Sequence, residues 1–243
     1  MSGEILFYTL LLIVSFLYAS VGHGGASGYL ALMACFFFTP DIMRPTALLL
    51  NLFVSLIAFI QYYKNGYFQW KLFWPFAITS IPAAFIGGNI HIDEGVYKKI
   101  LAVLLLFSVV KLIGFNDQLL EVRKKQNLIV SLIIGLIIGL FSGMIGIGGG
   151  IILSPLILLL HWADMKQTAA VSALFIFVNS LAGLSGSMIH GINFTSTMEL
   201  MLAIALIGGF AGSYFGAKKF NTIKLKYLLS IVLIIASAKL IFT

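Results

Sequence analysis

The sequence predicts an all-helical membrane protein built from two copies of one repeat, and three observations carry this prediction. Of the 243 residues, 60% are hydrophobic and only 9% are charged, and the mean hydropathy is +1.08. Soluble domains carry roughly a quarter charged residues, so this chain has too few to cover a water-facing surface. Its apolar stretches are continuous, which favours helices over a β-barrel. Short glycine-rich interruptions recur at matching places in the two halves.

Each half is predicted to hold a broken pair of helices followed by three full transmembrane spans. In the first half these are the pair 5–20 with 26–38 and the spans 45–63, 72–90 and 96–114. In the second half they are the pair 128–143 with 150–162 and the spans 168–188, 198–217 and 225–243. A span needs about 20 residues, and the second member of each pair is shorter. Each pair is therefore a re-entrant hairpin or two short spans.

The two halves align as repeats. "SVGHGGASGYLAL" (20–32) matches "MIGIGGGIILSPL" (144–156), and "MRPTALLLNLFVS" (43–55) matches "MKQTAAVSALFIF" (165–177). The chain is accordingly divided into repeat 1 (1–114), a charged linker (115–127) and repeat 2 (128–243).

The distribution of Lys and Arg predicts the topology. If each half crosses the membrane an odd number of times, the basic residues divide 11 to 4 between the two sides. Four crossings per half would divide them 8 to 7 and give no orientation. The positive-inside rule therefore favours the odd count, with the linker cytoplasmic and both termini outside. The repeats are then inverted, and short interrupted segments at matching positions of inverted repeats are typical of the binding sites of secondary transporters.

A helix that starts inside a membrane presents backbone N–H groups and the positive end of its dipole, which together bind anions. The two breaks are therefore candidate anion sites. Their residues are Gly22, His23, Gly24 and Gly25 in repeat 1, and Gly146, Gly148, Gly149 and Gly150 in repeat 2. The alternative is that glycine only permits close helix packing, which is the interpretation for the rows Gly135, Gly139, Gly143 and Gly212, Gly216.

Polar residues on the spans are candidates for completing the site. His23 could carry the proton of a coupled cycle, or be a neutral histidine bonded to a carbonyl. Further hydrogen bonds could come from Asn51, Thr168, Ser172 and Asn179, and also from Ser55 and Ser180. These side chains could equally well only join helices.

Several functional classes are disfavoured. The basic residues lie in short clusters between apolar runs, which argues against nucleic-acid binding. The single cysteine, Cys35, excludes CxxC sites, and His91, His161 and His190 match no metal motif. No GK[ST] follows the glycines, so ATP hydrolysis is unsupported. We therefore expect no cofactor, no metal and no enzymatic activity.

Two stretches carry a family resemblance. "GMIGIGGGIILSP" (143–155) with "KQTAAVSALFIFVNSLAG" (166–183) resembles the second-half signature of the TauE/SafE sulfite exporter family, and "ASVGHGGASGYL" (19–30) resembles its first-half counterpart. The resemblance covers nearly the whole chain and departs from the pattern at Ala31, which replaces a proline, and at His23. By position it extends to Gly146, Gly148, Gly149, Gly150, Pro155, Thr168, Ser172 and Asn179.

The resemblance implies a multi-pass transporter in a bacterial inner membrane, usually an exporter, for sulfite or an organosulfonate. Together with the inverted repeats, it predicts a secondary transporter that works by alternating access, with a small anion held between the two glycine-rich breaks. A passive anion channel and a membrane assembly factor that transports nothing are the alternatives.

Overall fold

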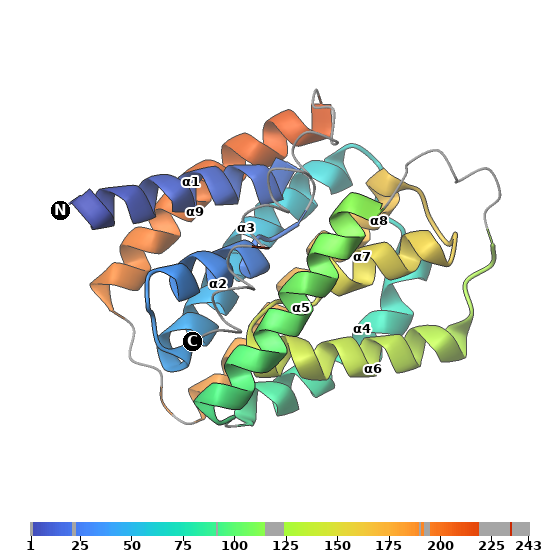
Figure 1. The fold of residues 1–243 in the computed structure, drawn as a ribbon. Coiled ribbons are helices and arrows are strands. Elements are labelled where there is room, and N and C mark those ends of the chain that lie inside the picture. The colour runs from blue at the N-terminus through green and yellow to red at the C-terminus, as the bar shows by residue number, and fades with distance from the viewer. Residues whose placement is uncertain are drawn as a thin grey trace.

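A computed structural model describes residues 2–20, 23–90, 92–114, 124–189, 191, 195–218 and 234 of the chain. Over these residues the protein is all-helical and contains no strand, as the sequence predicts (Figure 1). The helices are α1 (Ser2–Ser20), α2 (Ala26–Cys35), α3 (Pro40–Lys64), α4 (Trp70–Asn89), α5 (Glu94–Gly114), α6 (Leu128–Ile145), α7 (Gly150–Leu159), α8 (Met165–Met188) and α9 (Ser196–Lys218). The predicted last span, 225–243, lies outside the described residues except for residue 234, and so does 115–123 of the linker.

Five of the described helices are long and apolar enough to cross a membrane, judged by length and composition: α1, α3, α6, α8 and α9. Helices α4 and α5 occupy the other two predicted spans of repeat 1 but carry more polar residues. Prolines and Asn89 lower the hydropathy of α4, while α5 contains three lysines. The protein is thus a multi-pass membrane protein.

The two short helices, α2 and α7, have ten residues each. At 1.5 Å per residue they are about 15 Å long, half the thickness of a hydrocarbon core, which agrees with the prediction that these segments are shorter than a full span. Each starts behind a glycine in the left-handed conformation, Gly25 at φ 98° and Gly149 at φ 77°, with no side-chain cap. Because other residues rarely adopt this conformation, the sequence itself places the start of each short helix.

Close helix packing accounts for a separate set of glycines. A Cβ on Gly135, Gly139 or Gly143 of α6 would collide with backbone carbonyl oxygens of α4, which lies alongside it (Figure 1). The packing interpretation of this row is therefore confirmed. Gly212 of α9 lies in the same way against a carbonyl of α1.

The α4–α6 packing is repeated by α9 and α1 with the halves exchanged. Gly87 of α4 lies against the carbonyl oxygen of Leu140 on α6, and Gly212 of α9 lies against that of Phe16 on α1. Phe16 and Leu140 are related by the same offset along the chain as Gly24 and Gly148. The pairs α4–α6 and α9–α1 therefore share the same kind of glycine–carbonyl contact.

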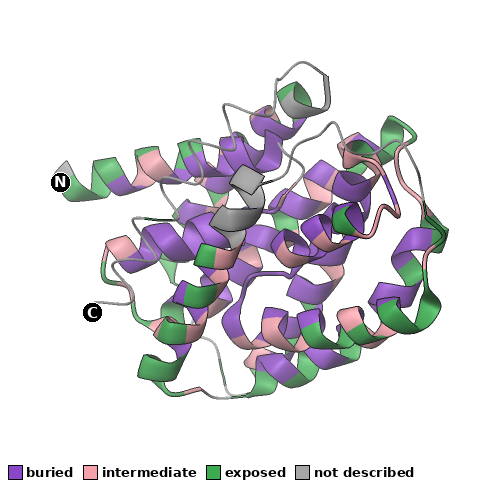
Figure 2. Ribbon diagram, turned by 45° about the vertical axis from the view of Figure 1, so that its right-hand side comes forward, coloured by how far each residue is buried: buried purple, intermediate pink, exposed green. Residues whose placement is uncertain are grey.

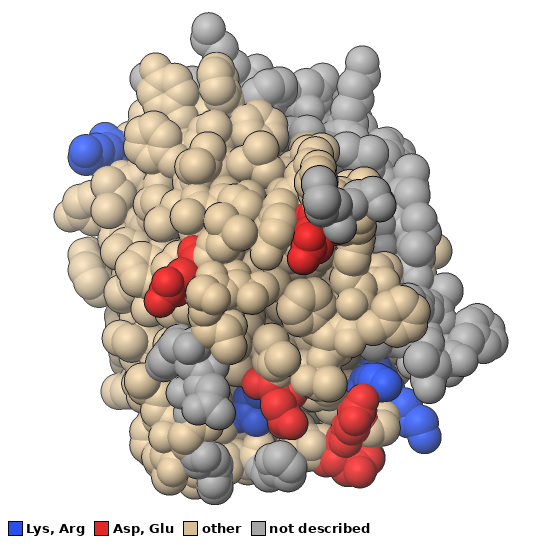
Figure 3. Space-filling model, turned by 90° about the vertical axis from the view of Figure 1, so that its left-hand side faces the viewer, with Lys and Arg blue, Asp and Glu red and all other residues tan. Residues whose placement is uncertain are grey.

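Burial follows this arrangement. Buried residues line the inner faces of the helices and exposed ones turn outward (Figure 2). Apolar side chains such as Ile133, Ile207 and Phe210 are among the exposed ones, which suits a surface in contact with lipid. The face drawn in Figure 3 is mostly uncharged, and most of its few acidic and basic side chains lie close together in the lower part of the view.

The α4–α6 contact predicts a stability effect. In Gly143→Ala the new Cβ would meet the backbone carbonyl of Ala84, which cannot rotate away. We expect the free energy of unfolding to fall by about 1–3 kcal/mol, the usual cost of overpacking, measured by denaturant or thermal unfolding in detergent. Gly3→Ala is the control, since no atom lies within 4 Å of its Cβ position. Equal stability of the two variants would contradict the close contact.

Candidate functional site

The two glycine-rich segments meet at Asn51, in the middle of α3. A Cβ placed on Gly24 would lie 2.7 Å from Asn51 Oδ1, and one placed on Gly148 would lie 2.6 Å from Asn51 Nδ2. Both positions also lie within 2.9 Å of Cγ2 of Ile176 on α8. Two segments more than 100 residues apart thus place their backbones against the same two side chains. We call Gly24, Gly148, Asn51, Ile176 and Ser180 the tip cluster, since Ser180 Oγ lies 3.0 Å from the Cβ position of Gly148.

Polar atoms in and around the tip cluster lack hydrogen-bond partners. Asn51 is fully buried, yet neither Nδ2 nor Oδ1 bonds to any described residue. The hydroxyls of Ser55, Ser142 and Ser180 are likewise buried and without a partner in the described part of the chain. More than nine in ten buried polar groups in proteins are paired. A group of unpaired ones between two helix N-termini is therefore a candidate ligand site.

The remaining glycines of the breaks have different surroundings. Gly25 lies against the ring of Tyr29, and Gly149 against Ile138 and Phe175. Gly150 lies against Ile176 and so borders the tip cluster.

Gly146 does not join the tip cluster. It ends α6 with φ 88° and lies against the backbone of Arg44, with a Cβ position 3.0 Å from the Arg44 carbonyl oxygen. Gly22 lies outside the described residues. His23 is half-buried, and its backbone N–H donates to the carbonyl of Tyr18 at 3.0 Å.

The predicted polar residues of α8 are spread along that helix. Ser172 accepts a hydrogen bond from the hydroxyl of Ser154 on α7 at 2.8 Å. Asn179 donates to the carbonyl of Phe175 at 2.8 Å, which leaves its Oδ1 buried and without a described partner. The buried hydroxyl of Thr168 also lacks one, but Thr168 precedes Ser180 by about 18 Å along the helix. Thr168 is therefore not part of the tip cluster.

Two residues of the site are absent from the sequence-based candidates. Ser142 lies beside the second break, its Cβ 3.5 Å from the Cβ position of Gly149, and a hydroxyl inside an apolar helix was the available signal. Ile176 has no such signal, because it is one apolar residue among many in α8.

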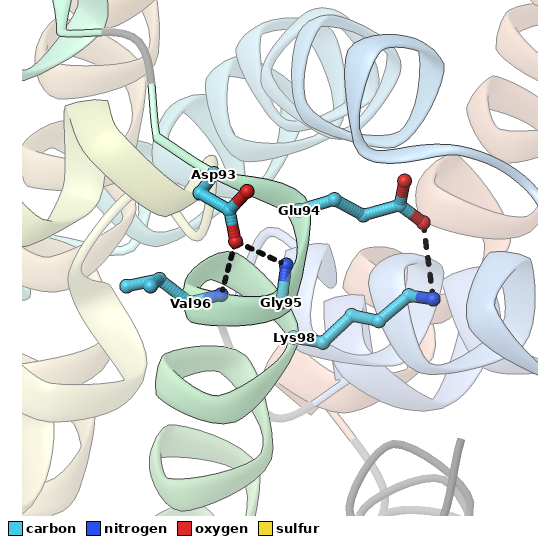
Figure 4. Close-up of polar contacts among 5 residues, drawn as sticks. All are labelled: Asp93, Glu94, Gly95, Val96 and Lys98. Atoms are coloured by element: carbon cyan, nitrogen blue, oxygen red, sulfur yellow. Dashed lines mark hydrogen bonds and ion pairs between the residues drawn. The ribbon is translucent and has the colours of Figure 1, made fainter.

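A cavity of about 320 Å³ lies at one end of the helices. Its lining includes Arg44 at the start of α3, Gly88 at the end of α4, Tyr97 near the start of α5 and Ser187 at the end of α8. The start of α5 is fixed by Asp93, whose carboxylate accepts hydrogen bonds from the N–H groups of Gly95 and Val96 at 2.9 and 3.3 Å (Figure 4). In the first turn Glu94 pairs with Lys98 at 3.0 Å.

Arg44 and Tyr97 connect this cavity to the second break. The Arg44 guanidinium donates to the carbonyls of Gly87 at 3.0 Å and Ile90 at 2.9 Å, and also to Gly88. These carbonyls belong to the last turn of α4 and to Ile90 directly after it, where few N–H groups of the helix are left to donate. The Gly87 carbonyl also accepts from the N–H of Ile90 at 3.2 Å. The Tyr97 hydroxyl donates to the carbonyl of Ile145 at 2.9 Å, directly before Gly146. The cavity therefore borders the second glycine-rich segment.

The opposite end is built differently. Lys166, which aligns with Arg44, donates to the hydroxyl of Tyr67 at 3.0 Å and lies 4.8 Å from the centre of that ring. Tyr67 packs in turn near Tyr62, at 6.4 Å between ring centres.

The tip cluster offers neutral hydrogen-bond groups and two helix N-termini. The described residues hold no group of three His, Cys, Asp or Glu side chains that could bind a metal ion. The arrangement suits a small ligand that accepts several hydrogen bonds, which is the chemistry of an oxyanion.

Apolar helices with two interrupted segments that meet at a buried polar side chain are typical of membrane transporters. Comparison with known proteins agrees, because the family model described as "Sulfite exporter TauE/SafE" matches residues 7–240. The chain belongs to the TauE/SafE family, whose members are membrane transporters and not enzymes. The resemblance noted in the sequence is thus confirmed.

Two curated relatives are similar over most of their length. "Probable membrane transporter protein y4hK" of Sinorhizobium fredii is 35% identical over 234 residues, 95% of each chain. "Probable membrane transporter protein YunE" of Bacillus subtilis is 25% identical over 228 residues, 84% of this chain and 82% of the relative. No solved structure matches.

The contact between Gly24 and Asn51 predicts a loss of function on Gly24→Ala. The new Cβ would lie 2.7 Å from Asn51 Oδ1 and 2.9 Å from Ile176 Cγ2, so the amide must move. We expect sulfite flux in proteoliposomes to fall at least about tenfold, because a displaced Asn51 amide loses its hydrogen bond to the substrate. Gly3→Ala serves as the control. Wild-type flux in Gly24→Ala would show that the position of the Asn51 amide does not matter.

Proposed function

We propose that the protein is a secondary transporter that exports a small sulfur oxyanion, sulfite or an organosulfonate, and binds it at the tip cluster. The observation that carries the proposal is that Gly24 and Gly148 both approach the same buried side chain, the amide of Asn51. Its polar atoms have no hydrogen-bond partner among the described residues. The family description supports the class of substrate.

The chemistry of the tip cluster favours an anion. Short helices α2 and α7 start beside it, and the first N–H groups of a helix have no acceptor within the helix. Their dipoles add positive potential at the same point. Glycine at both breaks lets a ligand approach the backbone without a Cβ in the way. The hydroxyls of Ser55, Ser142 and Ser180 add further donors.

Alternating access between two inverted repeats, 1–114 and 128–243, is the mechanism we propose. Two features support it: the exchange of partners between α4–α6 and α9–α1, and the position of both breaks at equivalent points of the repeats. In this mechanism the helices of one repeat move against those of the other around a site that stays fixed.

His23 is the proposed proton-coupling residue. It directly precedes Gly24 of the tip cluster, and histidine is the side chain whose charge changes most readily near neutral pH. Binding of a proton there together with the anion would couple the two movements. The bilayer proposed for the protein is the bacterial inner membrane, with residues 115–127 in the cytoplasm and both termini outside.

The proposal predicts saturable transport that depends on Asn51. Purified protein in liposomes should take up labelled sulfite with saturation and counterflow, which a passive channel would not show. Removing the amide in Asn51→Leu or the hydroxyl in Ser180→Ala should each lower the flux about tenfold, since one hydrogen bond to a charged group contributes about 1.5–3 kcal/mol.

The matched control is Ser80→Ala. Ser80 is equally buried, but its hydroxyl bonds to the carbonyl of Ala77 within its own helix α4, and the residue packs against Gly139 of α6. If Asn51→Leu does not change the flux, the proposal that the tip cluster binds the substrate is wrong. If sulfite, sulfonate and chloride all show no flux, the proposal of a transporter is wrong and an assembly factor is favoured.

The orientation predicts where thiol reagents react. In a Cys35→Ala background, Ser187→Cys at the cavity should react with a membrane-impermeant maleimide on intact cells, whereas Lys124→Cys at the linker should react only after permeabilisation. The two residues lie on opposite sides only if α6 and α7 together return to the side from which they entered. Reaction of both from one side would contradict the odd number of crossings.

A further inference from the structure

We propose that the tip cluster binds its oxyanion as a monoanion and prefers one that carries a proton, so that hydrogen sulfite is accepted and the sulfite dianion is not. This inference rests on the proposed function and adds the charge state of the substrate to it. Three properties of the site lead to it.

The first property is that the polar side chains of the cluster are neutral. They are the amide of Asn51 and the hydroxyl of Ser180. Ser55 lies one turn after Asn51 on α3, and Ser142 lies next to Gly149. The Born cost of burying an ion grows with the square of its charge, so a dianion costs about four times as much as a monoanion of the same size. Helix dipoles supply only about half a charge each. The site can offset the burial of one negative charge far better than two.

The second property is that the nearest basic side chains on α3 and α8 are held elsewhere. Arg44 lies two turns before Asn51 and donates to three carbonyls of the α4 end. Lys166 lies about 15 Å before Ile176 along α8 and donates to Tyr67. Neither side chain balances a second charge at the tip cluster. A protonated His23 beside Gly24 would add one positive charge, and the His23→Ala variant below removes it.

The third property is the unpaired acceptor at the centre of the cluster. A primary amide has two donor hydrogens and one acceptor oxygen, and both ends of the Asn51 amide are buried without a described partner. Whichever way the amide is turned, it presents an acceptor towards one break and donors towards the other. An oxyanion without a proton can only accept hydrogen bonds from the donor end of the amide. One with an O–H group can also donate to Oδ1. Asn179, directly before Ser180 on α8, has a second buried oxygen without a described partner.

The protein's own titration must be separated from that of the substrate. Helix α3 packs against α1, α2, α5, α8 and α9. The titratable or charged residues on these elements and on the adjoining break are Glu4, Tyr8, Tyr18, His23, Tyr29, Cys35, Asp41, Arg44, Tyr62, Tyr63, Lys64, Glu94, Tyr97, Lys98, Lys99, Lys111, Lys166, Glu199, Tyr214 and Lys218. Among these residue types, histidine alone titrates near neutral pH when unperturbed. His23 is therefore the residue for which the experiment must control.

The experiment compares sulfite with methanesulfonate, a sulfonate of similar shape that keeps one negative charge at every pH used. Initial fluxes of both are measured in the same proteoliposomes, below saturation, over a range of pH above and below the second ionisation of sulfurous acid. Protein-free vesicles correct for permeation of uncharged sulfur dioxide. Titration of the protein changes both fluxes together, so the ratio of sulfite to methanesulfonate flux isolates the protonation of the substrate.

We expect this ratio to fall about tenfold per pH unit above that ionisation, in step with the fraction of hydrogen sulfite. In His23→Ala the ratio should fall in the same way, even where the separate fluxes change. A ratio that does not vary with pH would overturn the inference while leaving transport of sulfur anions intact. Absence of flux for both anions at every pH would instead overturn the proposed function, and this inference with it.

Asn51 provides a second measurement. In Asn51→Leu we expect the ratio at low pH to fall about tenfold, because the proton of hydrogen sulfite loses its acceptor, and Asn51→Gln should restore part of it. Ser80→Ala should keep the wild-type ratio. An unchanged ratio in Asn51→Leu would overturn the role of the amide as acceptor, and sulfate flux equal to that of methanesulfonate would overturn the preference for a monoanion.

Discussion

A helix that starts inside a membrane has backbone N–H groups that neither lipid nor the helix itself can satisfy. Both α2 and α7 start behind a left-handed glycine without a side-chain cap, and the fold must bring each start to a polar partner or a ligand. Both breaks lie against Asn51 of α3 and Ile176 of α8. The Asn51 amide bonds to no described residue, so the partner that we propose is a ligand. The pairing of α3 with α8 thus supports both breaks at once, and the glycine contacts of α4 with α6 and of α1 with α9 hold the helices around them.

Much of this arrangement is predictable because glycine acts locally. Spaced glycines such as Gly135, Gly139 and Gly143 fix a packing face through helical periodicity alone. Clustered ones such as Gly148 and Gly149 cannot share one face and so mark a break. The charge-poor spans and the family pattern follow from composition and motif in the same direct way. For the same reason Asn51 could be chosen as a candidate, since an amide in an apolar helix needs a partner.

The rest depends on which segments meet, and that information is not local. Ile176 closes the site from α8, yet its side chain differs in no way from its apolar neighbours. Gly146 belongs to the same run as Gly148, but it ends α6 against Arg44, two residues short of the tip cluster. Thr168 has the right residue type but lies too far along α8 to join. Residue type and spacing thus identified candidates, while helix register and crossing decided which of them share a site.

The two ends of the α3–α8 pair differ although their basic residues align. Arg44 lines the cavity and is held on the carbonyls of α4, whereas Lys166 is bonded to Tyr67 near further aromatic rings. In the proposed transporter, an anion that enters the cavity meets the guanidinium first. A cation at the mouth raises the local concentration of anions. We propose that neutral donors at the tip cluster then bind the anion without a full counter-charge. A transporter needs such moderate binding because its ligand must leave again. In this proposal the cation at the cavity attracts the anion, and the neutral groups of the tip cluster, which lie apart from that cation, allow the anion to be released.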